Sequence, residues 1–309
     1  MRPLKVGVIL PHLEGWMTGE TARWSDLLEL ARVAEDVGFD SLWLADHMLY
    51  RLDGIEPFGV WECWSLLSAL AASTSRVELG TIVTCTSFRN PALLAKMADT
   101  VDEISGGRLI LGLGAGSHEA EYHAFGWPWD HRVSRFEEAL QIIHALLRTG
   151  AVDFDGTYYT ARECELRPRG PRHSGPPIMV GTLGERMLRL TARYADEWNM
   201  PWRNTVQAAV DLFPKGDAAC IAVDRDPATL KKSVSIHLDL PSRNRYPSKD
   251  WITQMRIAVN AVTGTPEEQA EVLRAYATAG VSTVQLWLEP MNPHGLEEFG
   301  RVLELLDGP

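Results

Sequence analysis

The sequence has little cysteine, and its cysteines do not cluster. The 309 residues contain four, Cys63, Cys85, Cys164 and Cys220, and no C-x-x-C pair occurs. Their wide spacing disfavours a disulfide scaffold and a zinc knuckle. No apolar run approaches the roughly 18 residues of a membrane span, and the run at 4–10 is too short for a signal peptide. We therefore expect a cytoplasmic protein that makes no membrane contact.

Positive charge is also scarce, because 30 Lys and Arg face 41 Asp and Glu, for a formal net charge of −11. Binding to nucleic acid needs a basic face that displaces counterions, so nucleic acid is not expected as a partner. No G-x-S-x-G elbow occurs, and no cysteine lies in a recognisable nucleophile setting. Hydrolase chemistry therefore has no positive indication.

Short apolar runs alternate with longer segments of helical periodicity along the whole chain. Strands are expected at 4–10, 41–45, 77–83, 108–113, 178–181, 197–200, 232–238 and 281–288. Helices are expected at about 21–37, 60–72, 90–104, 132–148, 185–194, 206–223, 265–280 and 296–306. Eight strand–helix units with continuously apolar strands predict a single α/β domain over 1–309, a (β/α)₈ TIM barrel. A doubly wound sheet competes, but it usually has fewer strands and a glycine-rich first loop.

Two stretches interrupt the alternation and are interpreted as insertions after strands 4 and 7. The first, 151–169, contains the hairpin signal Asp155-Gly156 followed by a Pro-rich segment. The second begins at 241 and leads to an apolar segment around 252–262.

Polar and aromatic residues follow the expected strands, where the active sites of such barrels collect. In chain order the polar ones are His12, Glu14, Asp46, His47, Thr84, His118 and Asn199. The pair Asp46-His47 is interpreted as an acid/base pair or as a group that orients a ring. We expect the substrate pocket to be formed by His12, Glu14, Trp16, Trp198 and Trp287, because aromatic walls suit a planar ligand.

Metal binding is not expected. His118 and His123 are five residues apart, not four, and so would not share one helical face.

Two glycine-rich turns are candidate binding loops. Gly181-Thr182-Leu183-Gly184 precedes a helix, and the free N–H groups of a helix N-terminus favour an anion such as phosphate. The alternative is a purely structural role as a tight strand-to-helix turn. The run Gly112-x-Gly114-x-Gly116 follows the fourth strand and so indicates a dinucleotide-binding site only weakly, because that fingerprint normally follows the first strand of its fold.

In-order segments carry a resemblance to a known family. They are 34–47 (AEDVGFDSLWLADH), 77–84 (VELGTIVT), 90–95 (NPALLA), 105–116 (SGGRLILGLGAG) with Glu119 and Glu121-Tyr122, 177–185 (PIMVGTLGE) and 195–199 (ADEWN). The sequence resembles the bacterial luciferase-like superfamily, including its coenzyme F420-dependent oxidoreductases. The resemblance implies a TIM barrel that binds F420, or alternatively FMN, and a non-proline cis peptide near 81–83.

The resemblance also implies functional roles for individual residues. His47 matches the catalytic histidine that faces the reactive ring. The implied cofactor contacts are Asp46, Ile82, Thr84, Gly114, Ala115, His118, Gly181, Thr182, Leu183 and Gly184. In the sugar-phosphate dehydrogenases of the family a glutamate acid lies in the turn after strand 4, where this chain has Ala115-Gly116. The resemblance further implies a homodimer and a small-molecule substrate, with a separate reductase as a source of reduced cofactor.

Several functions compete at this point. The leading one is an F420-dependent oxidoreductase that moves a hydride between the deazaflavin and a small organic substrate. The alternatives are a monooxygenase that uses reduced FMN and O₂, a glycoside-acting barrel with Glu119 and Glu289 as its carboxylates, and an inert flavin-binding protein.

Overall fold

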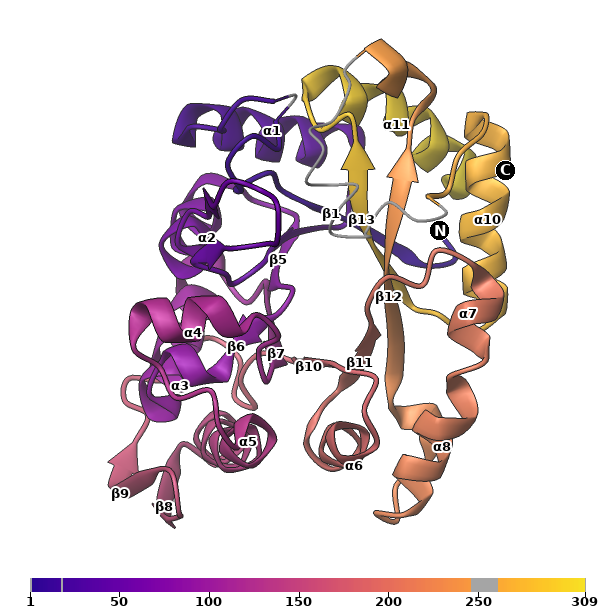
Figure 1. Ribbon diagram of the computed structural model, residues 1–309. Coiled ribbons are helices and arrows are strands. Elements are labelled where there is room, and N and C mark those ends of the chain that lie inside the picture. Colours follow the sequence, from indigo (N-terminus) through magenta and orange to yellow (C-terminus); the bar gives the residue numbers. More distant parts are fainter. Residues whose placement is uncertain (1, 18, 246–260, 309) are drawn as a thin grey trace.

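Eight parallel strands form a closed barrel in the computed structural model, which describes residues 2–17, 19–245 and 261–308 (Figure 1). The barrel strands are β1 (Lys5–Ile9), β2 (Ser41–Leu44), β5 (Glu78–Thr81), β7 (Leu109–Gly114), β10 (Ile178–Gly181), β11 (Glu197–Met200), β12 (Lys231–Asp239) and β13 (Thr283–Glu289). Neighbours run in the order β10-β11-β12-β13-β1-β2-β5-β7, and pairing of β7 with β10 closes the ring. The expected TIM barrel is confirmed.

The barrel interior is filled at its base by Trp43, which points inward from β2. A Cβ atom added at Gly7 of β1 or at Gly80 of β5 would lie 2.3 Å or 2.1 Å from the Trp43 indole, so both neighbouring strands leave room for it. The Trp43 Nε1–H donates to Ser41 Oγ at 2.8 Å. This packing closes the interior below the strand ends, where a cavity can then open.

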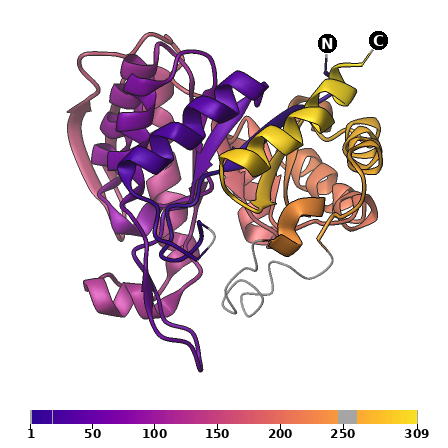
Figure 2. The ribbon, with the colours of Figure 1, turned by 90° about the horizontal axis from the view of Figure 1, so that it is seen from above.

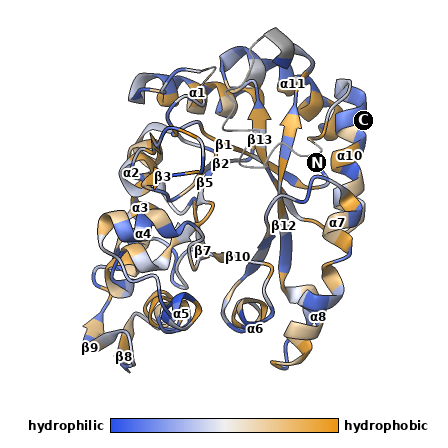
Figure 3. Ribbon diagram, viewed as in Figure 1, coloured by the Kyte–Doolittle hydropathy of each residue, from blue (hydrophilic) through white to orange (hydrophobic). Residues whose placement is uncertain are grey.

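The helices form a ring around the strands (Figure 1), and the view from above shows helices on both flanks of the barrel (Figure 2). They are α1 (Trp24–Val37), α2 (Cys63–Ser73), α3 (Pro91–Ser105), α5 (Arg132–Thr149), α6 (Glu185–Tyr194), α7 (Val206–Val210), α8 (Phe213–Ile221), α10 (Pro266–Thr278) and α11 (Pro293–Asp307). Figure 3 shows β13 as mainly hydrophobic, whereas α10 and α11 mix hydrophobic with hydrophilic residues. That contrast is expected for strands buried on both faces and helices with one solvated face.

One expected helix, 206–223, is wrong as a continuous element. The structure divides it into α7 and α8, with Asp211 and Leu212 between them. Pro214 lies in the first turn of α8, where it has no N–H to donate to the carbonyl of Val210 four residues earlier and its ring would clash with that carbonyl. The proline therefore begins a new helix instead of continuing the old one.

Short elements extend the strand ends. The bulged continuation of β5 is β6 (Thr84–Cys85), followed by the 3₁₀ turn η1 (Thr86–Phe88). After β2 comes the hairpin of β3 (Leu49–Tyr50) and β4 (Phe58–Gly59), and after β7 comes α4 (Glu119–Phe125); neither was expected from the sequence. The 3₁₀ turn η2 (Pro227–Thr229) precedes β12.

The first expected insertion is confirmed as the hairpin of β8 (Ala151–Asp155) and β9 (Thr160–Glu165). The second contributes η3 (Pro241–Arg245), and its remainder, 246–260, lies outside the described residues. Among the helices described, none is both long and apolar enough to cross a membrane.

Candidate active site

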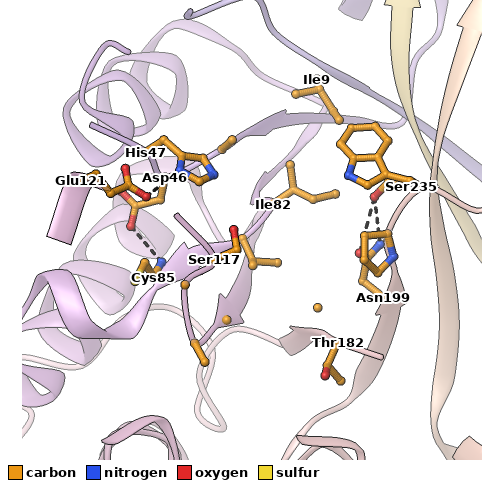
Figure 4. Close-up of a pocket in the computed structure, with 18 of the residues that line it drawn as sticks. Ile9, Asp46, His47, Ile82, Cys85, Ser117, Glu121, Thr182, Asn199 and Ser235 are labelled. Carbon is orange, nitrogen blue, oxygen red and sulfur yellow. Dashed lines mark hydrogen bonds and ion pairs between the residues drawn. The ribbon is translucent and has the colours of Figure 1, made fainter. Parts of the chain in front are cut away.

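A cavity of about 750 Å³ opens at the C-terminal ends of the strands. The strand ends that line it contribute Ile9, Ala45, Gly114, Gly181, Asn199 and Trp287. Figure 4 shows these walls with Ile82 in the middle of the view and His47, Thr182 and Ser235 around it. The volume lies in the range of small-molecule and cofactor sites, which is roughly 300–1,000 Å³.

One wall is a ridge formed where β5 is interrupted. The Ile82–Val83 peptide bond is cis, as the resemblance implied, and both residues line the cavity. Glycines at the ends of β7 and β10 accommodate the ridge. A Cβ atom at Gly114 would lie 2.5 Å from Val83 Cγ2, and one at Gly181 would lie 3.0 Å from Val83 Cγ1. Larger residues there would push the ridge away from its place in the wall.

His47 projects into the cavity from the end of β2 (Figure 4). Its Nδ1 lies 2.9 Å from Oε1 of Glu121 on α4, and the other Glu121 oxygen accepts the Met48 N–H at 2.9 Å. The Glu121 side chain is fully buried. Because an ionised carboxylate only accepts, this contact places a hydrogen on Nδ1 and leaves Nε2 for a ligand.

Glu121 was missed as a site residue by the sequence reasoning, although it lies within the resembling segments. Its signal was weak, because α4 was not expected and one acidic residue among Glu119, Glu121 and their neighbours looks like solvated helix surface. The structure distinguishes the two: Glu121 is buried, whereas the Glu119 side chain is 53% exposed and contacts His123 at 3.7 Å.

Asp46 lines the cavity but has both carboxylate oxygens occupied by its own chain. Arg89 donates to Oδ2 at 2.6 Å and to Oδ1 at 2.9 Å, and the Cys85 N–H donates to Oδ2 at 3.0 Å. Burial alone would lower the pKa of Arg89, but the hydrogen bonds and charges of Asp46 and Glu62 raise it. Asp46 thus ties the end of β2 to β6 and η1, and its contact with a cofactor stays a prediction.

Two further expected cofactor residues lie behind the cavity wall. Thr84 is buried, and its hydroxyl has no hydrogen-bond partner among the described residues. His118 Nε2 accepts the Arg51 N–H at 3.0 Å, and its ring lies 5.3 Å from that of Tyr50. Burial lowers the pKa of His118. Neither residue is among those that line the cavity.

The turn at 181–184 has the geometry of a strand end that leads into a helix. Gly181 and Thr182 line the cavity, whereas Leu183 and Gly184 lie beyond it. Gly184 is the N-cap of α6, and no side chain caps the helix. The N–H groups of the first turn are therefore open to an anion next to the cavity.

The expected substrate residues are divided by the structure. His12 and Glu14 line a separate, smaller cavity of about 140 Å³. The two ring nitrogens of His12 lie 2.8 Å from the carbonyl oxygens of Leu10 and Ala45, and Glu14 accepts the Gly59 N–H. Both residues therefore hold the loops beside β1 and are placed outside the main cavity.

Trp198 also lies outside the main cavity. Successive side chains of a strand point to opposite faces, and in β11 it is Asn199 that points inward. Trp198 points to the helices, where its Nε1–H donates to Thr182 O at 2.9 Å and its indole covers Gly216 of α8. Inside the barrel, Asn199 Nδ2 donates to Gln285 Oε1 at 3.0 Å.

Trp16 and Trp287 do line the cavity, together with Trp202, which the sequence analysis had not selected. We call these three residues the indole wall. The rings of Trp16 and Trp287 stack with centroids 3.7 Å apart, and Trp202 meets Trp287 at 65° with centroids 5.9 Å apart. The Nε1–H groups of Trp16 and Trp287 both donate to Glu289 Oε1, at 3.2 and 3.0 Å.

The positions of other reactive side chains bear on three alternatives: a cysteine nucleophile, a glycosidase carboxylate pair and a metal site. Burial raises the pKa of Cys85 to about 12, so its thiol is a poor nucleophile. Glu119 is exposed on α4 and Glu289 lies behind the indole wall, so the two do not flank one cavity as a glycosidase pair would. Within the described part of the chain, no cluster of three metal-ligating side chains occurs.

Comparison with known proteins gives relatives along most of the chain. The 5,10-methylenetetrahydromethanopterin reductase of Archaeoglobus fulgidus is 27% identical over 310 positions, which cover 85% of this chain and 89% of the relative. The F420-dependent hydroxymycolic acid dehydrogenase of Mycobacterium tuberculosis is 32% identical over 237 positions, covering 75% of this chain and 61% of the relative.

Among solved structures, an F420-dependent secondary alcohol dehydrogenase in complex with an F420–acetone adduct matches with a TM-score of 0.80, 20% identity and 98% coverage of both chains. At that identity the match supports the fold alone. The family model described as luciferase-like monooxygenase matches residues 4–239. The barrel, its strand-end cavity and this match together show that the chain belongs to the luciferase-like monooxygenase family of oxidoreductases.

Proposed function

We propose that this protein is an F420-dependent oxidoreductase that transfers a hydride between the deazaflavin and a small organic substrate. The observation that carries the proposal is His47, held through Nδ1 by the buried carboxylate of Glu121 and lining the same cavity as the Ile82–Val83 ridge. The F420-dependent mycobacterial relative supports the choice of cofactor.

The cavity has what such a cofactor needs. The ridge offers an apolar surface to one face of a flat ring. The uncapped N-terminus of α6, beside Gly181 and Thr182, suits the phosphate of the cofactor tail. Arg132 also lines the cavity, and its guanidinium is fixed by the Gly116 carbonyl at 2.8 Å and by the Trp129 ring at 3.5 Å.

The residues of the chain divide the work around a bound deazaflavin, which accepts or supplies the hydride. Oxidation of an alcohol releases a hydride and a proton, and His47 Nε2 accepts the proton; in the reverse direction the same nitrogen donates it. Glu121 fixes the ring orientation and the tautomer of His47. The apolar walls position the substrate and limit the access of water.

The surroundings of the reaction are proposed from the same family resemblance. We expect a cytoplasmic homodimer, and in the reductive direction a separate reductase has to supply reduced F420. The Ala115-Gly116 turn after β7 has no acidic side chain, so a sugar phosphate is not the expected substrate.

A monooxygenase that uses reduced FMN and O₂ is the second candidate, and the description of the matching family favours it. A titration separates the two. The purified protein is mixed with F420 and, separately, with FMN, and the fluorescence of each ring is followed. Micromolar binding of F420 with at least about tenfold weaker binding of FMN is expected, which is a difference of roughly 1.4 kcal/mol.

The His47→Ala variant is the matched control in this titration, because it should bind F420 with nearly the affinity of the wild type while losing turnover. Tight binding of FMN alone would support the monooxygenase, and binding of neither ring would overturn both candidates.

A further inference from the structure

We infer that the indole wall selects a neutral, flat, apolar substrate, such as an aromatic or cyclic alcohol or ketone, and that Trp202 sets this preference. The inference rests on the proposed function for its reaction, but its test measures binding and needs no turnover. Trp202 follows β11, Trp287 lies on β13 and Trp16 follows the neighbouring β1, so the wall is on the side of the cavity where Figure 4 labels Asn199 and Ser235, across from His47. It therefore faces the position at which a substrate would meet the histidine.

The geometry of the wall is fixed before any ligand enters. Trp16 and Trp287 are almost fully buried, stack on each other, and share one acceptor, Oε1 of Glu289. A shared acceptor holds both indole planes in one orientation, so a ligand that packs against them does not have to order them. Glu289 is in this sense a positioning residue of the wall.

Trp202 is the accessible member. It is 36% exposed, lines the cavity, and has a left-handed backbone conformation with φ of 55°, which non-glycine residues rarely adopt. Its turn is held from two sides: the Arg203 N–H donates to Ser235 O at 3.0 Å, and the Tyr276 hydroxyl donates to Arg203 O. Unusual backbone that its surroundings hold in place is common at ligand sites.

The angle between the indoles suits a flat ligand. Trp202 meets Trp287 at 65°, so the two rings form a corner. A planar ring can stack on one indole while its edge contacts the face of the other, and both arrangements are favourable for aromatic pairs.

Charge gives the wall its selectivity. The strongly ionisable side chains that line the cavity are Asp46, His47, Glu121 and Arg132, and all come from the β2, α4 and α5 side. Among the described lining residues, none on the wall side is a cation; the indole N–H groups face the carboxyl of Glu289, and the nearby His237 and Arg243 are not among the lining residues. An anion placed there would lose hydration without gaining a partner, which is costly in an apolar site.

Two probes that differ only in charge test the inference. Benzyl alcohol and benzoate share one ring, and their dissociation constants are measured by calorimetry or by saturation-transfer NMR, with and without F420. We expect benzyl alcohol to bind at least about tenfold more tightly than benzoate, or roughly 1.4 kcal/mol. Equal binding, tighter binding of benzoate, or binding of neither probe would overturn the inference.

Variants of Trp202 test whether this residue is responsible for the binding of benzyl alcohol. Trp202→Ala should weaken the binding of benzyl alcohol several-fold and leave the affinity for F420 unchanged. Trp202→Phe should retain part of the affinity for benzyl alcohol. Trp24→Ala is the matched control, since Trp24 on α1 has a similar exposure, 39%, and is not part of the cavity. Unchanged binding of benzyl alcohol in Trp202→Ala would contradict the assignment.

A second pair of variants tests the wall as a unit. Glu289→Ala removes the shared acceptor and should weaken the binding of benzyl alcohol as Trp202→Ala does. Glu289→Gln keeps an acceptor oxygen and should restore most of the binding. Should Glu289→Ala fail to fold, Glu289→Gln and Trp202→Ala still decide the question. A failure to bind F420 would contradict the proposed function but not the inference about the wall, because the preference between the two probes is measured separately.

Discussion

The two sides of the cavity are built in opposite ways. On the β2 side, ionisable residues form fixed pairs: Glu121 holds His47, and Arg89 holds Asp46 through both oxygens. On the β13 side, indoles stack, and the one carboxyl, Glu289, lies behind them. The difference indicates a division of labour in which the polar side carries proton chemistry and the aromatic side recognises the substrate.

Replacing His47 should break this division most strongly. His47→Ala removes the only histidine among the described residues that line the cavity, so kcat should fall by about 10²- to 10⁴-fold while the affinity for F420 stays nearly constant. The measurement is steady-state kinetics alongside the fluorescence titration. His123→Ala, which changes an exposed histidine of α4, is the control and should leave kcat unchanged. A similar kcat in both variants would contradict a catalytic role.

Breaking the second polar pair should act on stability. Arg89→Met leaves the buried Asp46 carboxylate without its partner and should lower the free energy of unfolding by about 3–5 kcal/mol, measured by urea denaturation. The double variant Asp46→Leu/Arg89→Met removes both charges and should recover much of the loss. If the double variant were as unstable as the single one, packing rather than the unpaired charge would be the cause.

The ridge between the two sides can be displaced sterically. In Gly114→Ala the new methyl group would lie 2.5 Å from Val83 Cγ2, so we expect a loss of about 1–3 kcal/mol in stability and weaker binding of F420. Gly300→Ala on α11, outside the cavity, is the matched control, because a Cβ there would make only an ordinary contact, with Val37 Cβ at 3.6 Å. Thermal unfolding and the fluorescence titration measure both effects. Equal behaviour of the two variants would show that the fit of the ridge to Gly114 does not matter.

The smallest expected effect comes from Glu62, which caps α2 and also contacts Arg89. Burial alone would raise its pKa, but hydrogen bonds from Ser65 and Trp64 and from Arg89 hold the pKa of Glu62 below its ordinary value. Because its side chain caps α2 by accepting two backbone N–H groups, Glu62→Ala should cost about 1 kcal/mol at pH 7.

The cost of Glu62→Ala should depend on pH. A carboxyl with a lowered folded pKa stabilises the protein above its unfolded value near 4.5 and loses that contribution as the pH falls through the folded pKa. The difference between wild type and variant in urea unfolding should therefore be constant from pH 7 to about 5.5 and narrow below about 4.5. A difference that widens on acidification would contradict the capping role.

Sequence patterns predicted the fold well where they are strongest. The ranges 178–181 and 197–200 agree with β10 and β11 at both ends, because both short strands lie between clear turn and helix signals. The expected helix 265–280 begins where α10 does, because Thr265 caps that helix and Pro266 follows it. The β3–β4 hairpin was not predicted, since two-residue strands leave no periodicity to detect.

The site was harder to predict because strand ends are known from sequence but side-chain directions are not. Trp198 and Asn199 are adjacent, and a shift of one residue decides which of them points into the barrel. Glu121 is distant from His47 in sequence, and only the fold brings them together. Trp202 lies in a turn whose left-handed backbone no local pattern indicates.

Hydride transfer without oxygen can be tested by an anaerobic single turnover. Protein loaded with reduced F420 is mixed with benzaldehyde in the absence of O₂, and the visible absorbance of the oxidised deazaflavin is recorded. We expect this absorbance to return together with one equivalent of benzyl alcohol, and the rate to fall about 10²-fold or more in His47→Ala. Oxidation that requires O₂, or that proceeds only with reduced FMN, would contradict this expectation.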